Sequence, residues 1–327
     1  MTSINSIIAA TGSYLPERIL TNAELESMVD TTDEWITQRS GIKQRHIAAE
    51  GESTGDMALA AARAALESSN LTPDDIDGVI VATTTPDRTF PSVAVKVQGE
   101  LGIKPCLAFD VQAVCTGFVY ALTTANNFIK CGQAKNILVI GAEKMSSLVD
   151  WKDRTTCVLF ADGAGAVILS AHEGDKGDGL KGQGIHSTHL YANGAQREML
   201  QTSGGVSTSG ENGVIEMQGR EVFKYAVSYM ADVVGEVLEQ NNITSDDIDW
   251  LVPHQANIRI IEATANKLNM GMDQVVVTVD HHGNTSAASI PLALDEAVRG
   301  GKIKRGQMLL IEAMGGGLTW GAALVRF

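Results

Sequence analysis

Short apolar runs alternate with helical patterns along the chain. Four runs rich in β-branched residues predict strands that are buried on both faces, and they span residues 77–82, 136–140, 274–279 and 308–311. Apolar residues recur at helical spacing from 221 to 238, and an alanine-rich helix is expected to follow Ser53. This alternation is typical of an α/β protein whose sheet is covered on both faces.

Two threonines mark expected helix starts. Thr21 and Thr31 each lie three positions before a glutamate, Glu24 or Glu34, which is the spacing of a capping box. In that motif the threonine hydroxyl accepts a hydrogen bond from a backbone N–H of the first turn, and the glutamate accepts one from the threonine N–H. We therefore expect a helix after each threonine.

Part of the sequence returns in the second half of the chain. Residues 72–77, TPDDID, return as residues 244–249, TSDDID, 172 positions later. Two further matches fall at shifts of 170 and 171: Asp110 with Asp280, and the apolar run at 136 with the run at 307. Recurrence by chance is the alternative, but three matches in chain order at nearly one offset favour an internal duplication.

The length of 327 residues fits a chain built from two such halves. We expect an N-terminal half over 1–172 that carries a nucleophilic cysteine, and a C-terminal half over 173–327. The glycine-rich segment 172–184 is the expected link between them.

The charge balance excludes several classes of partner. Lys and Arg total 25 against 39 Asp and Glu, and the net charge of −14 argues against a nucleic-acid binder, which needs a basic surface. No run of about 18 apolar residues predicts a membrane span, and no basic segment precedes the short N-terminal apolar run. The four cysteines lack metal-site spacing, which indicates reduced thiols and a cytoplasmic protein.

Cys115 is the first candidate for chemistry. It follows the strand-like run 107–111 and opens a helical pattern that ends at Lys130. At a helix N-terminus a thiol meets the positive end of the helix dipole and free N–H groups, which lower its pKa and can bind an oxyanion. The alternative is a buried cysteine that packs as a small apolar side chain.

The second half offers groups in matching places. His254 follows the repeated strand, and Asn284 follows its own strand-like run as Cys115 does, so both are expected where α/β enzymes gather catalytic groups. Three glycines at 315–317, after another strand, allow close backbone approach and free N–H donors. A structural histidine, a turn asparagine and a tight glycine turn are the alternatives for each feature alone.

Two other patterns are interpreted as structural. The segment DGAGA at 162–166 is glycine-rich, but it is not a GxGxxG motif that opens a helix. His254, His281 and His282 are not expected to bind a metal, because nothing in the sequence places two of them on one helical face.

The remaining motifs give the chain a family resemblance. Beside the Cys115 segment they are DEWI at 33–36, RSGI at 39–42, FPS at 90–92, DGAGA at 162–166, HQAN at 254–257, GNTSAAS at 283–289 and GGGLTWG at 315–321. Together they resemble β-ketoacyl-acyl carrier protein synthase III, the family of initiating condensing enzymes of bacterial fatty-acid synthesis. The resemblance runs from residue 7 to residue 327.

The resemblance implies a thiolase-like α/β fold, with duplicated halves in a five-layer αβαβα arrangement, and a homodimer. It implies a catalytic triad of Cys115, His254 and Asn284, with the N–H groups of Cys115 and Gly316 forming an oxyanion hole. Elongating condensing enzymes would have a second histidine in place of Asn284. A thiolase would need a cysteine near the C-terminus, whereas Cys157 is the last in this chain.

Other residues resemble the binding groups of the family. Those at coenzyme A would be Trp35, Arg39, Arg154 and Arg220. Those of the acyl pocket would be Phe90, which would cross the dimer interface, Met145 and Met314. Those that dock the carrier protein would be Lys224, Arg259 and Lys267. The chain departs from several relatives at Arg220, Met314 and Leu318, which bears on primer size and pantetheine contacts.

The implied reaction condenses an acyl-CoA primer, with acetyl-CoA expected, and malonyl-acyl carrier protein through an acyl-cysteine. The products would be β-ketoacyl-acyl carrier protein, coenzyme A and CO₂. No metal or redox cofactor is implied, since coenzyme A enters only as the carrier of the primer. A related ketosynthase of secondary metabolism would keep the same triad, a non-condensing acyltransferase would keep Cys115 without releasing CO₂, and a non-enzymatic binding protein would need no triad.

Overall fold

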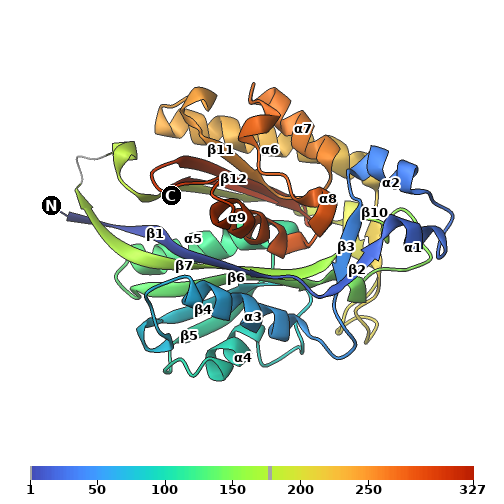
Figure 1. Cartoon of the computed structure of the whole chain (residues 1–327), viewed down its shortest axis with the longest axis horizontal. Coiled ribbons are helices and arrows are strands. Elements are labelled where there is room, and N and C mark those ends of the chain that lie inside the picture. The colour runs from blue at the N-terminus through green and yellow to red at the C-terminus, as the bar shows by residue number, and fades with distance from the viewer. Residues whose placement is uncertain (1, 176–178) are drawn as a thin grey trace.

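The computed structural model describes residues 2–175 and 179–327. In these residues two sheets face each other across a central pair of helices (Figure 1). The first sheet has the strand order β1-β7-β6-β4-β5, and the second has the order β11-β12-β13-β8. Their bounds are Thr2–Tyr14 (β1), Asp162–Asp175 (β7), Asn136–Lys144 (β6), Gly78–Ala82 (β4), Leu107–Val111 (β5), Trp250–Pro253 (β11), Met308–Gly315 (β12), Thr319–Arg326 (β13) and Gly184–Ala192 (β8).

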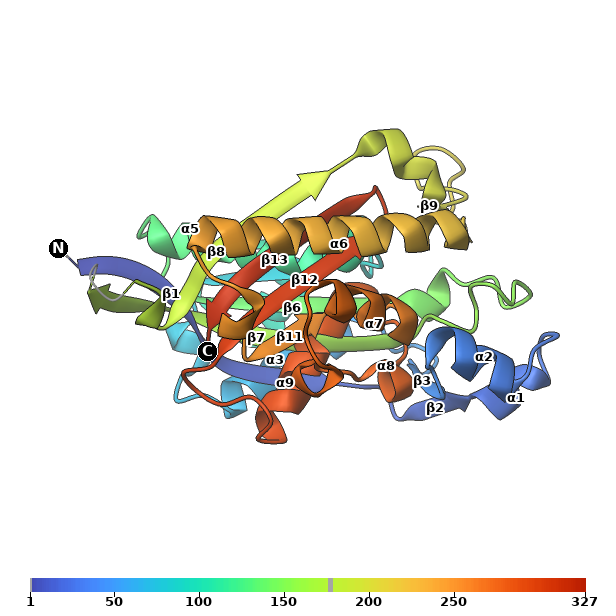
Figure 2. The ribbon, with the colours of Figure 1, turned by 90° about the horizontal axis from the view of Figure 1, so that it is seen from above.

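Helices form the other three layers. α5 and α9 lie between the sheets, α3 and α4 cover the outer face of the first sheet, and α6 and α7 cover the second, where α6 crosses over β12 and β13 (Figure 2). Their bounds are Thr54–Glu67 (α3), Val93–Glu100 (α4), Gly117–Lys130 (α5), Gly219–Asn241 (α6), Ile258–Lys267 (α7) and Ser289–Arg299 (α9). The predicted αβαβα arrangement is confirmed. None of the described helices is both long and apolar enough to cross a membrane.

Small elements gather at one end of the layers (Figure 1). They are β2 (Arg18–Thr21), α1 (Asn22–Glu26), α2 (Asp33–Ser40), β3 (Gln44–Ile47), β9 (Leu200–Thr202), β10 (Ile215–Met217) and α8 (Val279–His282). β2 pairs with β3 and β9 with β10, each as a two-stranded antiparallel sheet.

The central helices hold the core together. Phe118 and Leu122 of α5, four positions apart on one face, are fully buried, as is Leu294 of α9. They meet Ile80 from the first sheet and Leu309 from the second, both also fully buried. Each such side chain contributes about 1.5–3 kcal/mol through burial, so the two halves are joined by a continuous apolar layer.

The elements of the two halves correspond at a constant spacing of 172 residues. The short 3₁₀ helix Pro73–Asp75 recurs as Ser245–Asp247, and Val114–Thr116 recurs as Ser286–Ala288 directly before α9. The division at residue 172 stays a prediction; β7 itself runs to Asp175. Residues 176–178 of the expected link lie outside the described part of the chain.

Most predicted elements are confirmed, but the strand expected at 274–279 is wrong. Among the described residues, the second sheet has no fifth strand to match β5. Val275 makes a single bridge to Leu251, after which the chain turns into α8. The side chain of Gln255 replaces a neighbouring strand here, with hydrogen bonds of 3.0, 2.8 and 3.1 Å to the backbone of Val276, Thr278 and Val279.

The helix starts were predicted correctly at Thr21 and Ser53 but not at Thr31. Thr21 and Ser53 both form capping boxes, at the starts of α1 and α3. The residue that caps α2 is Thr32, whose hydroxyl accepts from the Trp35 N–H at 3.1 Å. Thr31 and Thr32 are adjacent and both carry a hydroxyl that can cap a helix, and the prediction of Thr31 was wrong by one residue.

Gly141 allows the closest approach between the two halves. It lies in β6, and a Cβ built there would stand 2.2 Å from the carbonyl oxygen of Ala287. We expect Gly141→Ala to lower the free energy of unfolding by at least about 3 kcal/mol, because a backbone atom cannot move aside. Gly235→Ala, on α6 with open space around it, should instead stabilise by about 0.5–1 kcal/mol. Chemical denaturation of both variants checks the pair, and equal effects would contradict the close approach.

Candidate active site

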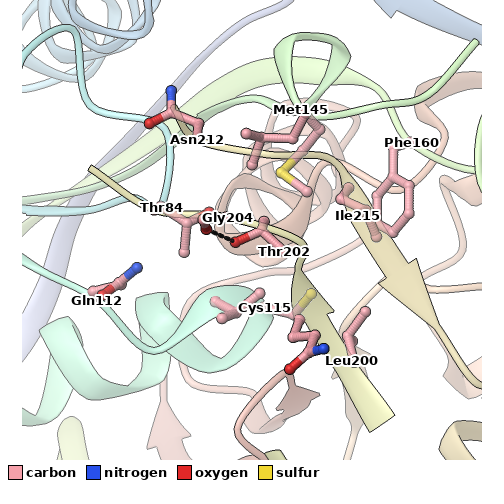
Figure 3. A pocket seen from close by; sticks show the side chains of 14 residues that line it. Thr84, Gln112, Cys115, Met145, Phe160, Leu200, Thr202, Gly204, Asn212 and Ile215 are labelled. Atoms are coloured by element: carbon pink, nitrogen blue, oxygen red, sulfur yellow. Dashed lines mark hydrogen bonds between the residues drawn. The ribbon is translucent and has the colours of Figure 1, made fainter. Parts of the chain in front are cut away.

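Two adjoining cavities meet at Cys115. The outer one, of about 690 Å³, is lined by Cys115, His254 and Asn284 together. The inner one, of about 340 Å³, extends from Cys115 past Met145 and Phe160 (Figure 3). The structure therefore brings the three predicted catalytic residues, from both halves of the chain, to one cavity.

The turn that carries Cys115 is strained. Cys115 lies in the 3₁₀ helix Val114–Thr116, directly before α5, rather than in the helix itself as the sequence suggested. Val114 has φ of 49°, a left-handed conformation that costs a β-branched residue about 1–3 kcal/mol. Ser286, its counterpart 172 positions later, has φ of 51°. Both turns that flank the cavity thus hold a residue in an unfavourable conformation.

The thiol of Cys115 is protonated in this arrangement. Burial raises its pKa to about 12, and the Glu143 carboxylate adds to the rise. Hydrogen bonding with the Ser286 side chain and with the residue's own N–H lowers the pKa, but it does not outweigh the loss of solvent. The expectation of a pKa lowered by the helix N-terminus is therefore wrong, because the sulfur is too deeply buried.

His254 presents an N–H group. It follows β11, and its Nδ1 lies 2.6 Å from Ser289 Oγ, which also accepts from the Gln255 N–H at 3.3 Å. The arrangement that satisfies every group has the Ser289 hydroxyl donating to Nδ1, so we assign the proton of the ring to Nε2. Burial lowers the pKa of His254 to about 3, and the ring is neutral.

Asn284 presents its amide NH₂. Its Oδ1 accepts from the Ser286 N–H at 3.0 Å, which fixes the orientation of the side-chain amide. Its backbone is bound on both sides, because its N–H donates to the Leu159 carbonyl and its carbonyl accepts from Ala161, both at 2.9 Å. Two neutral N–H donors, from His254 and Asn284, thus line the cavity that also holds the thiol.

The glycine triplet brings a third backbone segment against Cys115. A Cβ at Gly315 would lie 2.7 Å from the Cys115 nitrogen, so only glycine fits there. Gly316 follows, and its N–H donates to no other group among the described residues. A free backbone N–H is the kind of donor that an oxyanion hole requires.

The residues expected at coenzyme A gather around Trp35. Trp35, Arg39 and Arg220 line the outer cavity. The guanidinium carbons of Arg39 and Arg154 lie 4.6 and 5.3 Å from the centre of the Trp35 ring. Arg154 lies outside the cavity lining and donates to the Asp30 carbonyl at 2.6 Å. An aromatic ring beside two cations suits a flat base with phosphates.

The three residues expected in the acyl pocket lie in different places. Met145 lines the inner cavity, Met314 lines the outer one, and Phe90 lines neither. The side chain of Phe90 is 81 % exposed, which is unusual for a phenylalanine.

The residues expected to dock a carrier protein are all exposed. Arg259 lines the mouth of the outer cavity and stacks on Phe223, with its guanidinium carbon 5.4 Å from the ring centre. Lys224 is the next residue along α6. Lys267 is the last residue of α7, about 12 Å along the helix from Arg259.

Sequence reasoning missed a group of buried polar residues behind the site. These are Glu143, Gln255 and Ser289, with Ser286 as the link to Cys115. One signal was available: Glu143 is an acidic residue near the end of an otherwise apolar strand, where burial has to be compensated.

The fold and the cavity define the class of the protein, a thiolase-like α/β enzyme with a cysteine, a histidine and an asparagine at one site. Residues 109–194 match the family "3-Oxoacyl-[acyl-carrier-protein (ACP)] synthase III", and residues 238–327 match its C-terminal part. The chain is 58 % identical over 324 residues to β-ketoacyl-[acyl-carrier-protein] synthase III of Rhodospirillum centenum, with 99 % of both chains covered.

Solved structures agree. The crystal structure of 3-oxoacyl-[acyl-carrier-protein] synthase III from Aquifex aeolicus has a TM-score of 0.92 at 51 % identity, covering 98 % of this chain and 100 % of that one. The priming β-ketosynthase of the R1128 polyketide pathway has a TM-score of 0.91 at 34 % identity, with 98 % and 96 % covered. The chain belongs to the β-ketoacyl-acyl carrier protein synthase III family, and it is a condensing acyltransferase.

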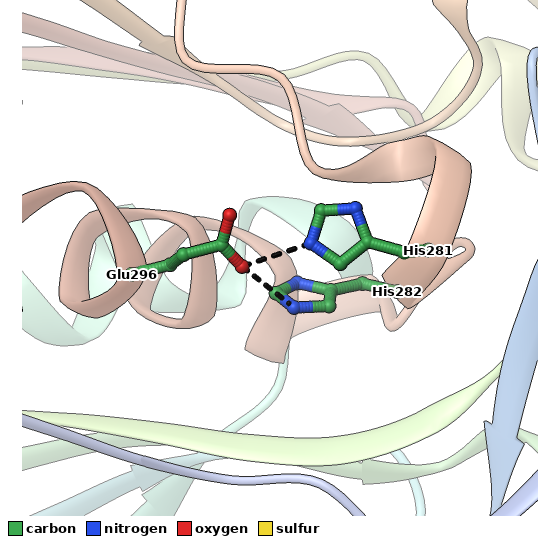
Figure 4. Close-up of side chains that lie close together, drawn as sticks. All are labelled: His281, His282 and Glu296. Carbon is green, nitrogen blue, oxygen red and sulfur yellow. Dashed lines mark hydrogen bonds and ion pairs between the residues drawn. The ribbon is translucent and has the colours of Figure 1, made fainter. Parts of the chain in front are cut away.

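A second cluster of titratable groups lies beside the Asn284 loop. Glu296 of α9 contacts the Nε2 atoms of His281 and His282 at 2.9 and 3.1 Å, through the same carboxylate oxygen (Figure 4). Asp280 lies 2.8 Å from the other ring nitrogen of His281. His281 and His282 thus meet at Glu296, and His254 is not part of the cluster. The two histidines are adjacent in the sequence, so a search for residues on one helical face does not find them. Hydrogen bonds that His281 donates to Glu296 and Asp280 outweigh partial burial and raise the pKa of His281 to about 9.

We expect this ion pair to make stability fall at alkaline pH. The pKa of His281 is higher in the folded state than its ordinary value near 6.5, so its stabilisation is complete below pH 6.5 and is lost as the pH rises through about 9. The melting temperature of the wild type should therefore fall more steeply over this pH range than that of His281→Gln. Glu296→Gln should remove the same pH-dependent stabilisation. The same dependence of the melting temperature on pH in all three proteins would contradict the assignment.

Proposed function

We propose that this protein condenses an acyl-CoA primer with malonyl-acyl carrier protein and so begins fatty-acid synthesis. The products are β-ketoacyl-acyl carrier protein, coenzyme A and CO₂. One observation carries the proposal: a thiol and two neutral N–H donors, from both halves of the chain, line one cavity. Family membership supports the reaction class.

In the first stage Cys115 attacks the primer thioester. The tetrahedral oxyanion is held by the N–H groups of Cys115 and Gly316, coenzyme A leaves, and the acyl group stays on Cys115. The outer cavity supports this stage, since the proposed coenzyme A residues Trp35 and Arg220 share it with Cys115. We propose that Arg39 and Arg154 assist from beside Trp35.

In the second stage malonyl-acyl carrier protein enters the same cavity and loses CO₂. The negative charge that develops on its thioester oxygen needs donors that are already in place. The N–H of His254 and the amide of Asn284 are such donors, and the neutral ring of His254 can donate without releasing a proton. The resulting carbanion attacks the acyl group on Cys115.

Acetyl-CoA is the expected primer, and the inner cavity receives the acyl group. Met145 and Ile215 (Figure 3), together with Leu148, give this cavity an apolar wall. No step of the proposed chemistry uses a metal or a redox cofactor, because protein groups supply the nucleophile and every donor. All four cysteines are free, which supports a reducing, cytoplasmic location.

We further propose a homodimer and an electrostatic docking site. The 81 % exposure of Phe90 supports the proposal that this ring enters a partner's acyl pocket. Lys224 and Arg259, with Lys267 beyond them, give a locally basic surface to a chain that carries a net charge of −14. An acidic carrier protein would otherwise be repelled.

A second candidate is a priming ketosynthase of secondary metabolism. The 34 % identity to the R1128 enzyme over 98 % of this chain favours it as the alternative. It would use the same three catalytic residues, so primer preference decides between the two. Steady-state kinetics with a panel of acyl-CoA primers and malonyl-acyl carrier protein makes that measurement.

The two stages should separate by mutation. His254→Ala and Asn284→Ala should still form acyl-Cys115 but should lose CO₂ release by about 10²–10³-fold, the usual effect of removing one such donor. Cys115→Ala should lose acylation and keep decarboxylation. Radiolabelled primer and trapped CO₂ measure the two stages. If His254→Ala lost acylation and kept normal decarboxylation, His254 would act in the first stage, and its assignment to the second stage would be wrong.

Carrier docking should depend on a few charges. Lys224→Glu and Arg259→Glu should lower kcat/KM for malonyl-acyl carrier protein by about tenfold at low salt, and acyl-CoA loading should be nearly unchanged. Lys104→Glu is the matched control, because Lys104 is exposed and pairs with Asp74, away from the cavity mouth. If loading falls together with carrier use, these residues do not form a docking site.

A further inference from the structure

The proposed first stage leaves one proton without an acceptor. The Cys115 thiol is buried and protonated, and it has to lose its proton as it attacks the primer. His254 presents its Nε2–H to the cavity, and the lone pair on Nδ1 accepts from Ser289, so the ring offers no acceptor to the sulfur. A base is needed, and it has to reach a sulfur that is almost closed off from solvent.

Glu143 is a buried carboxylate that no step has used. It lies near the end of β6 and is fully buried. Three consecutive threonines donate to it from the segment after β4: Thr83 Oγ1 at 3.2 Å, the Thr84 N–H at 3.0 Å, Thr84 Oγ1 at 3.0 and 3.1 Å, and Thr85 Oγ1 at 2.6 Å. These bonds fix the carboxylate in place.

Ser286 connects this carboxylate to the nucleophile. Its hydroxyl donates to Glu143 Oε1 at 3.1 Å. Its turn packs against the turn of Cys115, and its side chain lowers the pKa of the Cys115 thiol. Its position is well determined, because its N–H donates to Asn284 and its φ of 51° commits the turn to one conformation. The three groups form a continuous path between the halves, from Cys115 through Ser286 to Glu143.

We propose that Glu143, acting through the Ser286 hydroxyl, accepts the proton of the Cys115 thiol during acylation and returns it after condensation. As the Cys115 sulfur bonds to the acyl carbon, the thiol proton passes to Ser286 Oγ and the hydroxyl proton of Ser286 passes to Glu143. Coenzyme A leaves as a thiolate and takes a proton from solvent. When the carbanion displaces Cys115, the thiolate recovers its proton from Glu143 by the reverse path.

The balance over both stages is one solvent proton consumed and one CO₂ released. In this proposal Ser286 exchanges the proton with the reacting sulfur and is a catalytic residue, whereas Glu143 acts only through Ser286 and is a positioning residue. The inference rests on the proposed function, since it assigns the proton of its first stage.

The test measures acylation and decarboxylation separately in Glu143→Gln. The amide keeps the size of the side chain but cannot accept the proton, so the single-turnover rate of primer transfer should fall by about 10²-fold or more. The rate should also rise with pH across the range where the wild type is level, because hydroxide then takes over the role. Glu143→Asp should recover part of the rate. CO₂ release from malonyl-acyl carrier protein should change little.

Ser286→Ala gives a gentler second variant, because Glu143 keeps its bonds to the threonines. It should show the same loss of acylation and the same change of pH profile. Thr123→Val is the control, since Thr123 bonds only within α5, to the Val119 carbonyl. Acylation at the wild-type rate with an unchanged pH profile would overturn the proposal. An equal fall of acylation and decarboxylation would overturn it too, by assigning Glu143 a structural role. A wild type that forms no acyl-Cys115 would instead refute the proposed function.

Discussion

The close contact between the turns before α5 and α9 determines the rest of this structure. Each turn contains a residue in a left-handed conformation, Val114 or Ser286, and each lies beside one of the proposed catalytic residues, Cys115 or Asn284. Gly141 of β6 leaves room for the backbone at Ala287, so the turn before α9 packs closely against the first sheet. The apolar layer around α5 and α9 then holds both halves at this distance.

Burial at this contact decides the chemistry. Away from water the thiol of Cys115 keeps its proton and the ring of His254 stays neutral. A neutral histidine whose Nδ1 is bound to Ser289 donates a hydrogen bond, which suits the stabilisation of an enolate. The same desolvation surrounds Glu143 and Ser286, which form the polar route that we propose for the proton of Cys115.

Patterns of local origin were predicted well and patterns that depend on pairing were not. The strands β4, β6 and β12, the helix α6 and the caps at Thr21 and Ser53 follow from apolar period and capping chemistry. The run 274–279 has the composition of a strand, but the side chain of Gln255 takes its hydrogen bonds. The residues 274–279 alone cannot show that a side chain takes the place of a neighbouring strand, because Gln255 lies outside this segment.

The sequence by itself determined the duplicated α/β architecture, the αβαβα layers through the family resemblance, and the three residues around which the site is built. Only the tertiary structure decided their chemical state. Three properties depend on burial and on contacts between residues distant in the sequence: whether Cys115 is protonated, which nitrogen of His254 carries its hydrogen, and that Glu143 lies behind Ser286. A pKa and a tautomer are properties of an environment, and that environment is assembled only when the two halves pack together.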